Sequence, residues 1–193
     1  MPNSNIRNLS PTLLSDNWYT LKKYRFEYRN RHGQWIAQER EAYDRGNGAA
    51  ILLYHPTKKT VILTRQFRLP AYVNGNEDGM LIEACAGLLE EDDPLECIKK
   101  ESIEETGYHV ENVQKVFEAY MSPGSVTEIL HFFVAEYDES LKQSSGGGLA
   151  EEQEEIEILE LDFSQALAMI KTGEIKDAKT IMLLYHLALE GVL

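Results

Sequence analysis

Three glutamates within five residues constrain this chain more than any other stretch of its sequence. Glu101, Glu104 and Glu105 stand in the segment KESIEETG, which ends at Gly107. Residues three and four positions apart share one face of a helix, so these carboxylates would line one stripe and repel one another. A hard divalent cation prefers carboxylate oxygens and would neutralise that repulsion. The segment therefore predicts a helix that holds Mg²⁺ or Mn²⁺; the alternative is an acidic helix face that is simply solvated.

The flanking residues predict where this helix begins and ends. Pro94 suits the first helical turn, and Asp92 or Asp93 is a suitable N-cap. Gly107 is the residue at which we expect the helix to stop, because glycine adopts the left-handed conformation common just beyond a helix.

A predicted strand, residues 81–86, precedes the acidic helix and ends at Gly87. Glycine has no side chain, so the backbone at this position can approach a ligand closely. The backbone carbonyl of Ala86 is therefore a further candidate metal ligand.

Composition argues against several classes of function. The chain has 193 residues, a net charge of −13 and a sequence pI near 4.8, which argues against nucleic-acid or anionic-membrane binding. A small phosphate-bearing substrate remains compatible, because metals can bridge carboxylates and phosphate oxygens. No run of about 18 apolar residues predicts a membrane span, and residues 1–17 lack the apolar core of a signal peptide. Cys85 and Cys97 are expected to be reduced, with a structural disulfide as the alternative, so we expect a cytoplasmic protein.

The first 45 residues are predicted to form a separate antiparallel β extension. Residues 1–12 read as a polar arm, residues 18–28 alternate aromatic and charged side chains, residues 30–33 form a hairpin turn, and residues 35–43 return. A short ribbon of this kind is marginal alone, so it must pack on something. We expect it to mediate dimerisation; its aromatic side chains would cover the main core, bind a base or contact the second subunit.

Residues 46–193 are predicted to form the main domain. A polar loop is expected at 71–80, and strands are expected at 49–54, 61–68, 81–86, 113–120, 129–137 and 156–161. Two helices follow: one at 166–171, which Ser164 can cap, and one that Asp177 can cap and that runs through Leu189. Mixed strands with a central helix and terminal helices fit an α/β class, an α/β/α sandwich built on a mixed sheet.

The stretch from Gly87 to Tyr108 resembles the signature of the Nudix hydrolases, G-x5-E-x7-R-E-U-x-E-E-x-G-U, in which U is a bulky aliphatic residue. The segment between Asp93 and Lys100 is one residue short, and we expect the loop around Pro94 to absorb the deletion. The substitutions relative to the signature are Asp93 for Glu, Lys100 for Arg, and Ser102 and Tyr108 for aliphatic residues.

The resemblance implies an α/β/α fold and hydrolysis of a nucleoside diphosphate linked to another moiety. Glu101 and Glu105 match the metal ligands of the signature, and Glu104 supports them as a ligand or through water. Lys100 takes the place of the arginine that orients a glutamate by ion pairing. Its ammonium group is a single point charge, whereas the guanidinium of arginine can form two parallel hydrogen bonds with a carboxylate.

In this family a general base or an extra metal ligand often comes from a mobile loop outside the signature. The glycine-rich residues 144–148, followed by the acidic residues 151–155, are our candidate for that loop. We choose Glu154 as the ligand or base, with Glu152 second and Glu128 as a further candidate. The alternative is a solvated cluster of charges.

The wider chain is similar to the GDP-mannose pyrophosphatases of the NudK type, in segments such as LSDNWYTL, EREAYDRGNGA and VNGNEDGMLIEACAGLL. This similarity implies Mg²⁺-dependent hydrolysis of GDP-mannose to GMP and mannose 1-phosphate by a homodimer whose ribbon crosses to the partner. Trp18 would stack on the guanine base or, alternatively, cover the ribbon. The substrate-binding candidates are Trp18, Glu39, Arg40, Glu41, Arg68, Ala86, Gly87, Leu88, Glu128, Gln153 and Lys179.

Other functions remain open on the sequence. Pro123 lies sixteen residues beyond Gly107, and a proline at this spacing resembles the pattern of the ADP-ribose pyrophosphatases. ADP-ribose is therefore the alternative substrate. A catalytically silent Nudix-fold binding module is an alternative of another class, although the complete glutamate set argues against it. A purely structural acidic protein is the third.

Overall fold

The computed structural model describes residues 4–89 and 93–193, without the side chain of Glu152. The chain divides into two compact units. One contains the residues up to Asn47 together with Tyr120–Ile129, and the other contains Gly48–Ala119 and Leu130–Leu193.

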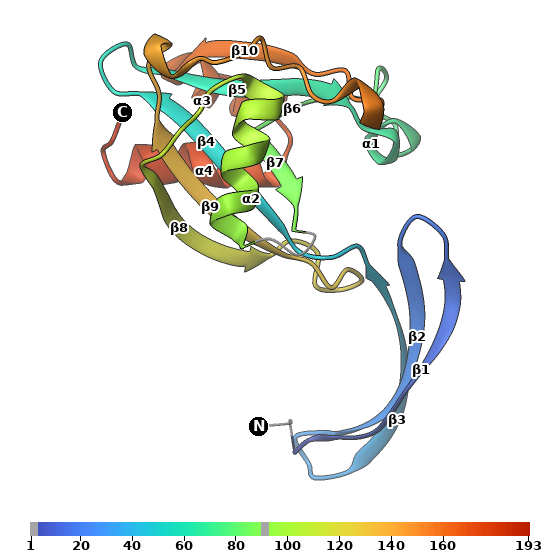
Figure 1. Cartoon of the computed structure of the whole chain (residues 1–193). Helices are drawn as coiled ribbons and strands as arrows, with labels where there is room; N and C mark the ends of the chain where they lie inside the picture. The colour runs from blue at the N-terminus through green and yellow to red at the C-terminus, as the bar shows by residue number, and fades with distance from the viewer. Residues whose placement is uncertain (1–3, 90–92) are drawn as a thin grey trace. The chain divides into compact units, whose positions relative to one another are not determined.

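The first unit is built on a three-stranded antiparallel sheet in the order β1-β2-β3 (Figure 1). Strand β2 (Thr20–Arg29) pairs with β3 (Trp35–Asp44) without a break in register. Between them, the side chain of Asn30 accepts hydrogen bonds from the backbone N–H groups of His32 and Gln34. The predicted hairpin is therefore present.

The predicted polar arm is wrong, because most of it belongs to a third strand, β1 (Ile6–Asp16). This strand pairs with β2, and its register is interrupted after Arg7 and after Leu13. Pro11 is tolerated because β1 is an edge strand, and the irregularities break the alternation that reveals a strand in sequence. Asn8, with φ of 57°, lies within the first irregularity.

The second unit contains a seven-stranded mixed sheet. Its main path runs β10-β5-β4-β9-β8, with β4 parallel to β9 and antiparallel to β5. The five strands of this path are β4 (Gly48–His55), β5 (Thr60–Phe67), β8 (Val113–Tyr120), β9 (Ile129–Glu136) and β10 (Glu157–Asp162). Their positions follow the apolar runs of the sequence.

Helices cover both faces of this sheet. Helix α2 (Pro94–Glu101) and helix α4 (Ala178–Leu189) both pack on β4, from opposite sides (Figure 1). Helix α3 (Phe163–Thr172) packs against β5 and β10. The short helical segments of this unit include α1 (Leu69–Val73), η2 (Glu139–Leu141) and η3 (Ala150–Glu152). The α/β class with a mixed sheet and an N-terminal β extension is confirmed.

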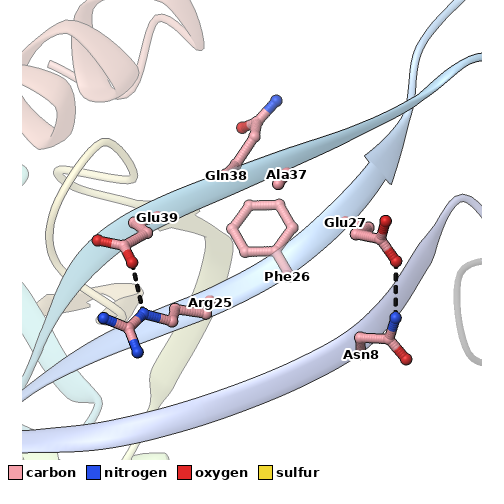
Figure 2. A pocket seen from close by; sticks show the side chains of 7 residues that line it. All are labelled: Asn8, Arg25, Phe26, Glu27, Ala37, Gln38 and Glu39. Atoms are coloured by element: carbon pink, nitrogen blue, oxygen red, sulfur yellow. Dashed lines mark hydrogen bonds and ion pairs between the residues drawn. The ribbon is translucent and has the colours of Figure 1, made fainter.

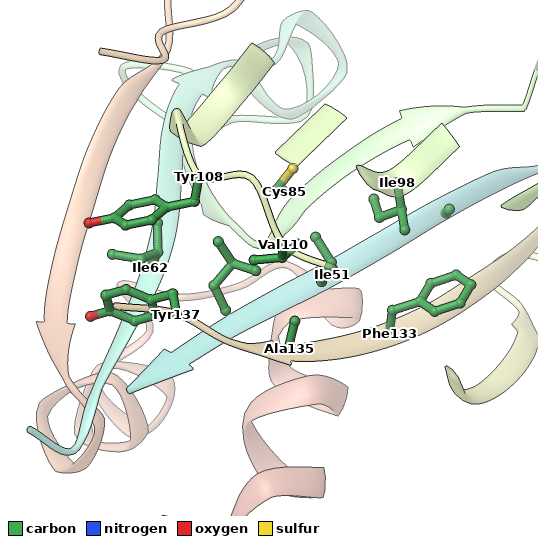
Figure 3. Close-up of a cluster of buried hydrophobic side chains, with 11 residues drawn as sticks. Ile51, Ile62, Cys85, Ile98, Tyr108, Val110, Phe133, Ala135 and Tyr137 are labelled. Atoms are coloured by element: carbon green, nitrogen blue, oxygen red, sulfur yellow. The ribbon is translucent and has the colours of Figure 1, made fainter. Parts of the chain in front are cut away.

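The core lies on both faces of β4, whose residues 49–53 are at most 1% exposed. On one face, Ile98 of α2 belongs to a buried cluster with Ile51 and Phe133 (Figure 3). On the other, α4 contributes fully buried leucines, Leu183, Leu184 and Leu187. Burial on both faces explains the continuous apolar run of this strand.

Three local predictions need correction. The expected single strand 81–86 is two strands, β6 (Met80–Glu83), which pairs with β5, and β7 (Cys85–Leu88), which pairs with β4. Ala84 lies between them, and its N–H donates to Oγ1 of Thr180 at 2.6 Å. Helix α1 overlaps the start of the expected polar loop, and Asp162 rather than Ser164 caps α3.

No helix of the described residues is long and apolar enough to cross a membrane.

Candidate active site and metal centre

The acidic helix begins and ends where the sequence predicts. Asp93 is the N-cap and accepts a hydrogen bond from the N–H of Leu95 at 2.9 Å, whereas Asp92 lies outside the described residues. Helix α2 continues into a π-helical turn, η1 (Ser102–Thr106), and stops at Gly107, whose φ is 83°. A π turn is rare and often occurs at functional sites.

The carboxylate of Glu101 lies directly against strand β7. A β-carbon at position 87 would overlap the side chain of Glu101, so glycine is required for this arrangement. Gly87 stands opposite Ala49 in the regular antiparallel ladder between β7 and β4. The glycine therefore brings the backbone close to a glutamate that is a predicted metal ligand.

Glu105 is the most deeply buried of the three motif carboxylates, at 2% exposure. Its Oε2 accepts a hydrogen bond from the N–H of Ala86 at 3.2 Å, and the thiol of Cys85 also donates to it. Burial is the largest cause of a pKa of about 7 for Glu105; the charges of Glu101 and Glu154 also raise this pKa, and the two hydrogen-bond donors lower it. A carboxylate that is buried among like charges favours a nearby cation.

Glu104 is the motif glutamate that pairs with Lys100. Nζ of Lys100 lies 3.9 Å from Oε1 of Glu104, and the lysine side chain is 65% exposed. A pair this long and this exposed restrains the glutamate weakly.

The glycine-rich segment makes backbone hydrogen bonds with the end of the acidic helix. The N–H of Gly147 donates to the carbonyl of Glu105 at 2.9 Å, and that of Gly148 donates to the carbonyl of Glu104 at 3.1 Å. Gly146, Gly147 and Gly148 all have left-handed φ values, between 64° and 106°. These glycines satisfy carbonyls at the end of the acidic helix, which otherwise lack partners.

Glu154 is the acidic-loop residue that the structure brings to the motif. Its charge contributes to the raised pKa of Glu105, and its Oε2 accepts a hydrogen bond from the N–H of Leu149 at 3.0 Å. The neighbouring Gln153 is exposed, and the side chain of Glu152 lies outside the described residues. Glu128 belongs to the other unit, where it pairs with Arg45 at 3.6 Å.

The carboxylates fit an open metal site rather than a closed cage. Across residues 4–89 and 93–193, no three acidic, histidine or cysteine side chains converge closely enough to enclose an ion by themselves. Glu101, Glu105 and Glu154 repel one another, and Mg²⁺ usually keeps several waters and binds through one or two carboxylates plus substrate phosphates. Hard oxygen donors around a buried glutamate suit such an ion.

Two predicted substrate-binding cations meet at a residue that the sequence analysis missed. Arg68 and Lys179 both pair with Glu83, at 2.7 Å and 2.6 Å, and Glu83 is 3% exposed. A charged residue inside the apolar strand segment LIEACAG was the available signal. Ala86, Gly87 and Leu88, the other candidates nearby, lie on β7.

The remaining candidates lie on the ribbon unit. Trp18 is 86% exposed, so it does not cover the ribbon. Glu39 pairs with Arg25 at the edge of a shallow hollow (Figure 2), and also lies 3.7 Å from Lys23. Arg40 donates to the carbonyl of Glu39, and Glu41 is exposed.

Comparison with known proteins assigns the class. Residues 44–184 match the NUDIX domain, and the chain therefore belongs to the Nudix hydrolase family, whose members generally use divalent metal ions. Residues 5–43 match the GDP-mannose pyrophosphatase NudK N-terminal domain. The predicted family is confirmed.

Relatives in enterobacteria are similar along nearly the whole chain. The chain is 64% identical over 179 residues to the GDP-mannose pyrophosphatase of Pectobacterium atrosepticum. This match covers 93% of this chain and 92% of that protein. It is 60% identical over 175 residues to the protein of that name from Salmonella typhimurium, covering 91% of each chain. It is 58% identical over 181 residues to the one from Escherichia coli, covering 94% of each chain.

Proposed function

We propose that this protein hydrolyses the pyrophosphate bond of GDP-mannose to GMP and mannose 1-phosphate, with Mg²⁺ as the metal and Mn²⁺ as a substitute. The observation that carries the proposal is that the carboxylates of Glu101 and Glu105 both lie against strand β7, while a third carboxylate, from a distant segment, contributes its charge to the raised pKa of Glu105. Glu101 and Glu105 come from the acidic helix, and Glu154 comes from the loop after the glycines. The names of the relatives support the choice of nucleotide sugar.

The proposed metal ligands are Glu101, Glu105, Glu154 and the backbone carbonyl of Ala86. A bound divalent ion would neutralise charge on the diphosphate oxygens and lower the pKa of the attacking water. Glu104 supports this site as a ligand or through water. Glu154 is either a ligand or the base that accepts the proton of that water, and the glycine segment holds its loop against the helix.

Further residues are proposed to contact the substrate. Arg68 and Lys179 supply positive charge for the diphosphate, and the backbone of Ala86, Gly87 and Leu88 borders the site. Trp18, whose ring is exposed, stacks on the guanine base. The other contacts proposed are Glu39, Arg40, Glu41, Glu128 and Gln153.

A homodimer through the ribbon is also proposed. None of residues 4–47 is buried, and the ribbon exposes large apolar side chains, among them Leu9, Leu13, Leu14 and Ile36. Such a sheet needs a partner surface to be stable. We further propose a cytoplasmic location, supported by the two buried cysteines, Cys85 and Cys97, which are not joined in a disulfide.

The test is the identity of the products when GDP-mannose is hydrolysed in the presence of Mg²⁺. GMP with mannose 1-phosphate supports attack on phosphorus, whereas GDP with free mannose contradicts it. Turnover of ADP-ribose above that of GDP-mannose would replace the proposed substrate by the alternative. Failure to hydrolyse either compound would favour a silent binding module.

A further inference from the structure

Glu83 is a buried acid that is shared by two cations. Its Oε2 accepts a hydrogen bond from Nε of Arg68 at 2.7 Å, and its Oε1 accepts one from Nζ of Lys179 at 2.6 Å. The side chain of Glu83 is 4% exposed and that of Lys179 is 13% exposed, whereas Arg68 is 39% exposed. Each carboxylate oxygen of Glu83 therefore pairs with one cation, and of the two cations Arg68 is the one that is open to solvent.

The lysine is also restrained from a second direction. Oδ1 of Asp177 lies 2.9 Å from Nζ of Lys179, and Oδ2 of Asp177 accepts from the N–H and the hydroxyl of Thr180. The hydroxyl oxygen of Thr180 in turn accepts from the N–H of Ala84. This network connects the start of helix α4 to the break between β6 and β7, next to the strand of the proposed metal site.

A buried carboxylate shared by two cations contributes little to the free energy of unfolding. Removing charged groups from water is costly, and apolar residues of similar volume often stabilise a core as well or better. What the shared carboxylate does supply is a fixed geometry for two cations with long, flexible side chains. Because the contact with Arg68 uses Nε, the two terminal amino groups of the guanidinium remain donors outside this hydrogen bond.

We propose that Glu83 is a positioning residue that holds Arg68 and Lys179 ready for the diphosphate of the substrate. The inference rests on the proposed function, in which both cations contact the nucleotide sugar. Cations that are oriented before binding lose less conformational freedom when the substrate arrives. Glu83 itself does not touch the substrate.

The variant Glu83→Gln tests this role through the sign of the change in KM for GDP-mannose, measured with Mg²⁺. Loss of one negative charge leaves the region more positive, so a purely electrostatic effect would lower KM for an anionic substrate. Loss of orientation raises KM, by about tenfold, with a smaller change in kcat. A lower melting temperature with unchanged or lowered KM would overturn the proposal.

KM measured for two further variants separates loss of orientation from loss of folding. Glu83→Asp retains the charge, but its shorter side chain cannot reach both cations, so KM is expected to rise here too; an unchanged KM would overturn the proposal. Glu157→Gln is the matched control, since Glu157 of β10 pairs with Arg65 of the neighbouring strand β5 at 3.3 Å. This control is expected to leave KM unchanged.

A mutant cycle separates the inference from the proposed function. In the double variant Arg68→Gln/Lys179→Gln, adding Glu83→Gln is expected to have no further effect on KM, because its targets are gone. A further rise in KM would overturn the proposal. If Arg68→Gln and Lys179→Gln each leave KM unchanged, the proposed substrate contacts fail together with the inference. If each raises KM while Glu83→Gln does not, the inference alone fails.

Discussion

The carboxylate of Glu101 occupies the space that a side chain at Gly87 would fill. The two residues lie 14 positions apart in the motif, Glu101 at the end of α2 and Gly87 on strand β7. Position 87 therefore controls where a proposed metal ligand points, even though glycine has no functional group.

Gly87→Ala is expected to lower kcat for GDP-mannose on the order of 100-fold, because displacement of a catalytic group by about 1 Å is enough for such a loss. The fold should persist, since the overlapping atoms are those of a flexible side chain. Steady-state kinetics and a thermal melt check both statements. Gly124→Ala, where a β-carbon would meet nothing within 4 Å, is the control. Wild-type kcat in Gly87→Ala would refute the metal role of Glu101.

Glu101→Gln and Glu105→Gln are each expected to lower kcat at least about 100-fold, because metal-assisted charge stabilisation is worth several kcal/mol. Both should also reduce the rise in melting temperature that Mg²⁺ produces, since only a ligand that favours the native state stabilises it. Glu105→Gln should melt no lower than the wild type without Mg²⁺, because a buried charge is removed. Glu96→Gln, on the exposed side of the same helix, is the control. Normal hydrolysis by both variants would exclude the metal assignment.

Gly146→Ala is expected to weaken both folding and catalysis. A β-carbon there would lie 2.6 Å from the backbone carbonyl oxygen of Glu105, and φ is 64°. The left-handed conformation alone costs about 1–3 kcal/mol for a residue other than glycine, and the backbone overlap adds to it. Denaturant unfolding measures the sum. Gly191→Ala isolates the conformational cost, because its φ is 66° and nothing lies within 4 Å. Equal losses in the two variants would mean that the glycine segment does not restrain the helix.

Leu9→Glu/Leu13→Glu is expected to convert a wild-type dimer into a monomer. These leucines are 58% and 56% exposed on β1, and charges there would be buried unpaired at an apolar interface. Sedimentation equilibrium gives the mass of each species. Leu189→Glu, at an 86% exposed position on α4, should leave the mass unchanged. A wild-type chain that sediments as a monomer would contradict the proposed dimer.

The sequence by itself determined the features that depend on neighbouring residues. The spacing of Glu101 and Glu105, the N-cap at Asp93 and the stop at Gly107 are local relations, and the structure has each of them. The apolar run of β4 likewise predicts a strand that is buried on both faces. The Nudix family followed from the same helix, because its signature is a local pattern.

The tertiary structure decided the relations between distant segments. Strand β1 exists because it pairs with β2, the strand after residue 80 divides at Ala84 because its two parts pair with different neighbours, and the glycines face the carbonyls of η1. Lys179 reaches Glu83 across 96 residues of sequence. Periodicity reports which face of an element is apolar, but the partners on that face are set by packing of the whole sheet and its helices. For that reason the motif could be predicted and the residue that holds its neighbouring cations could not.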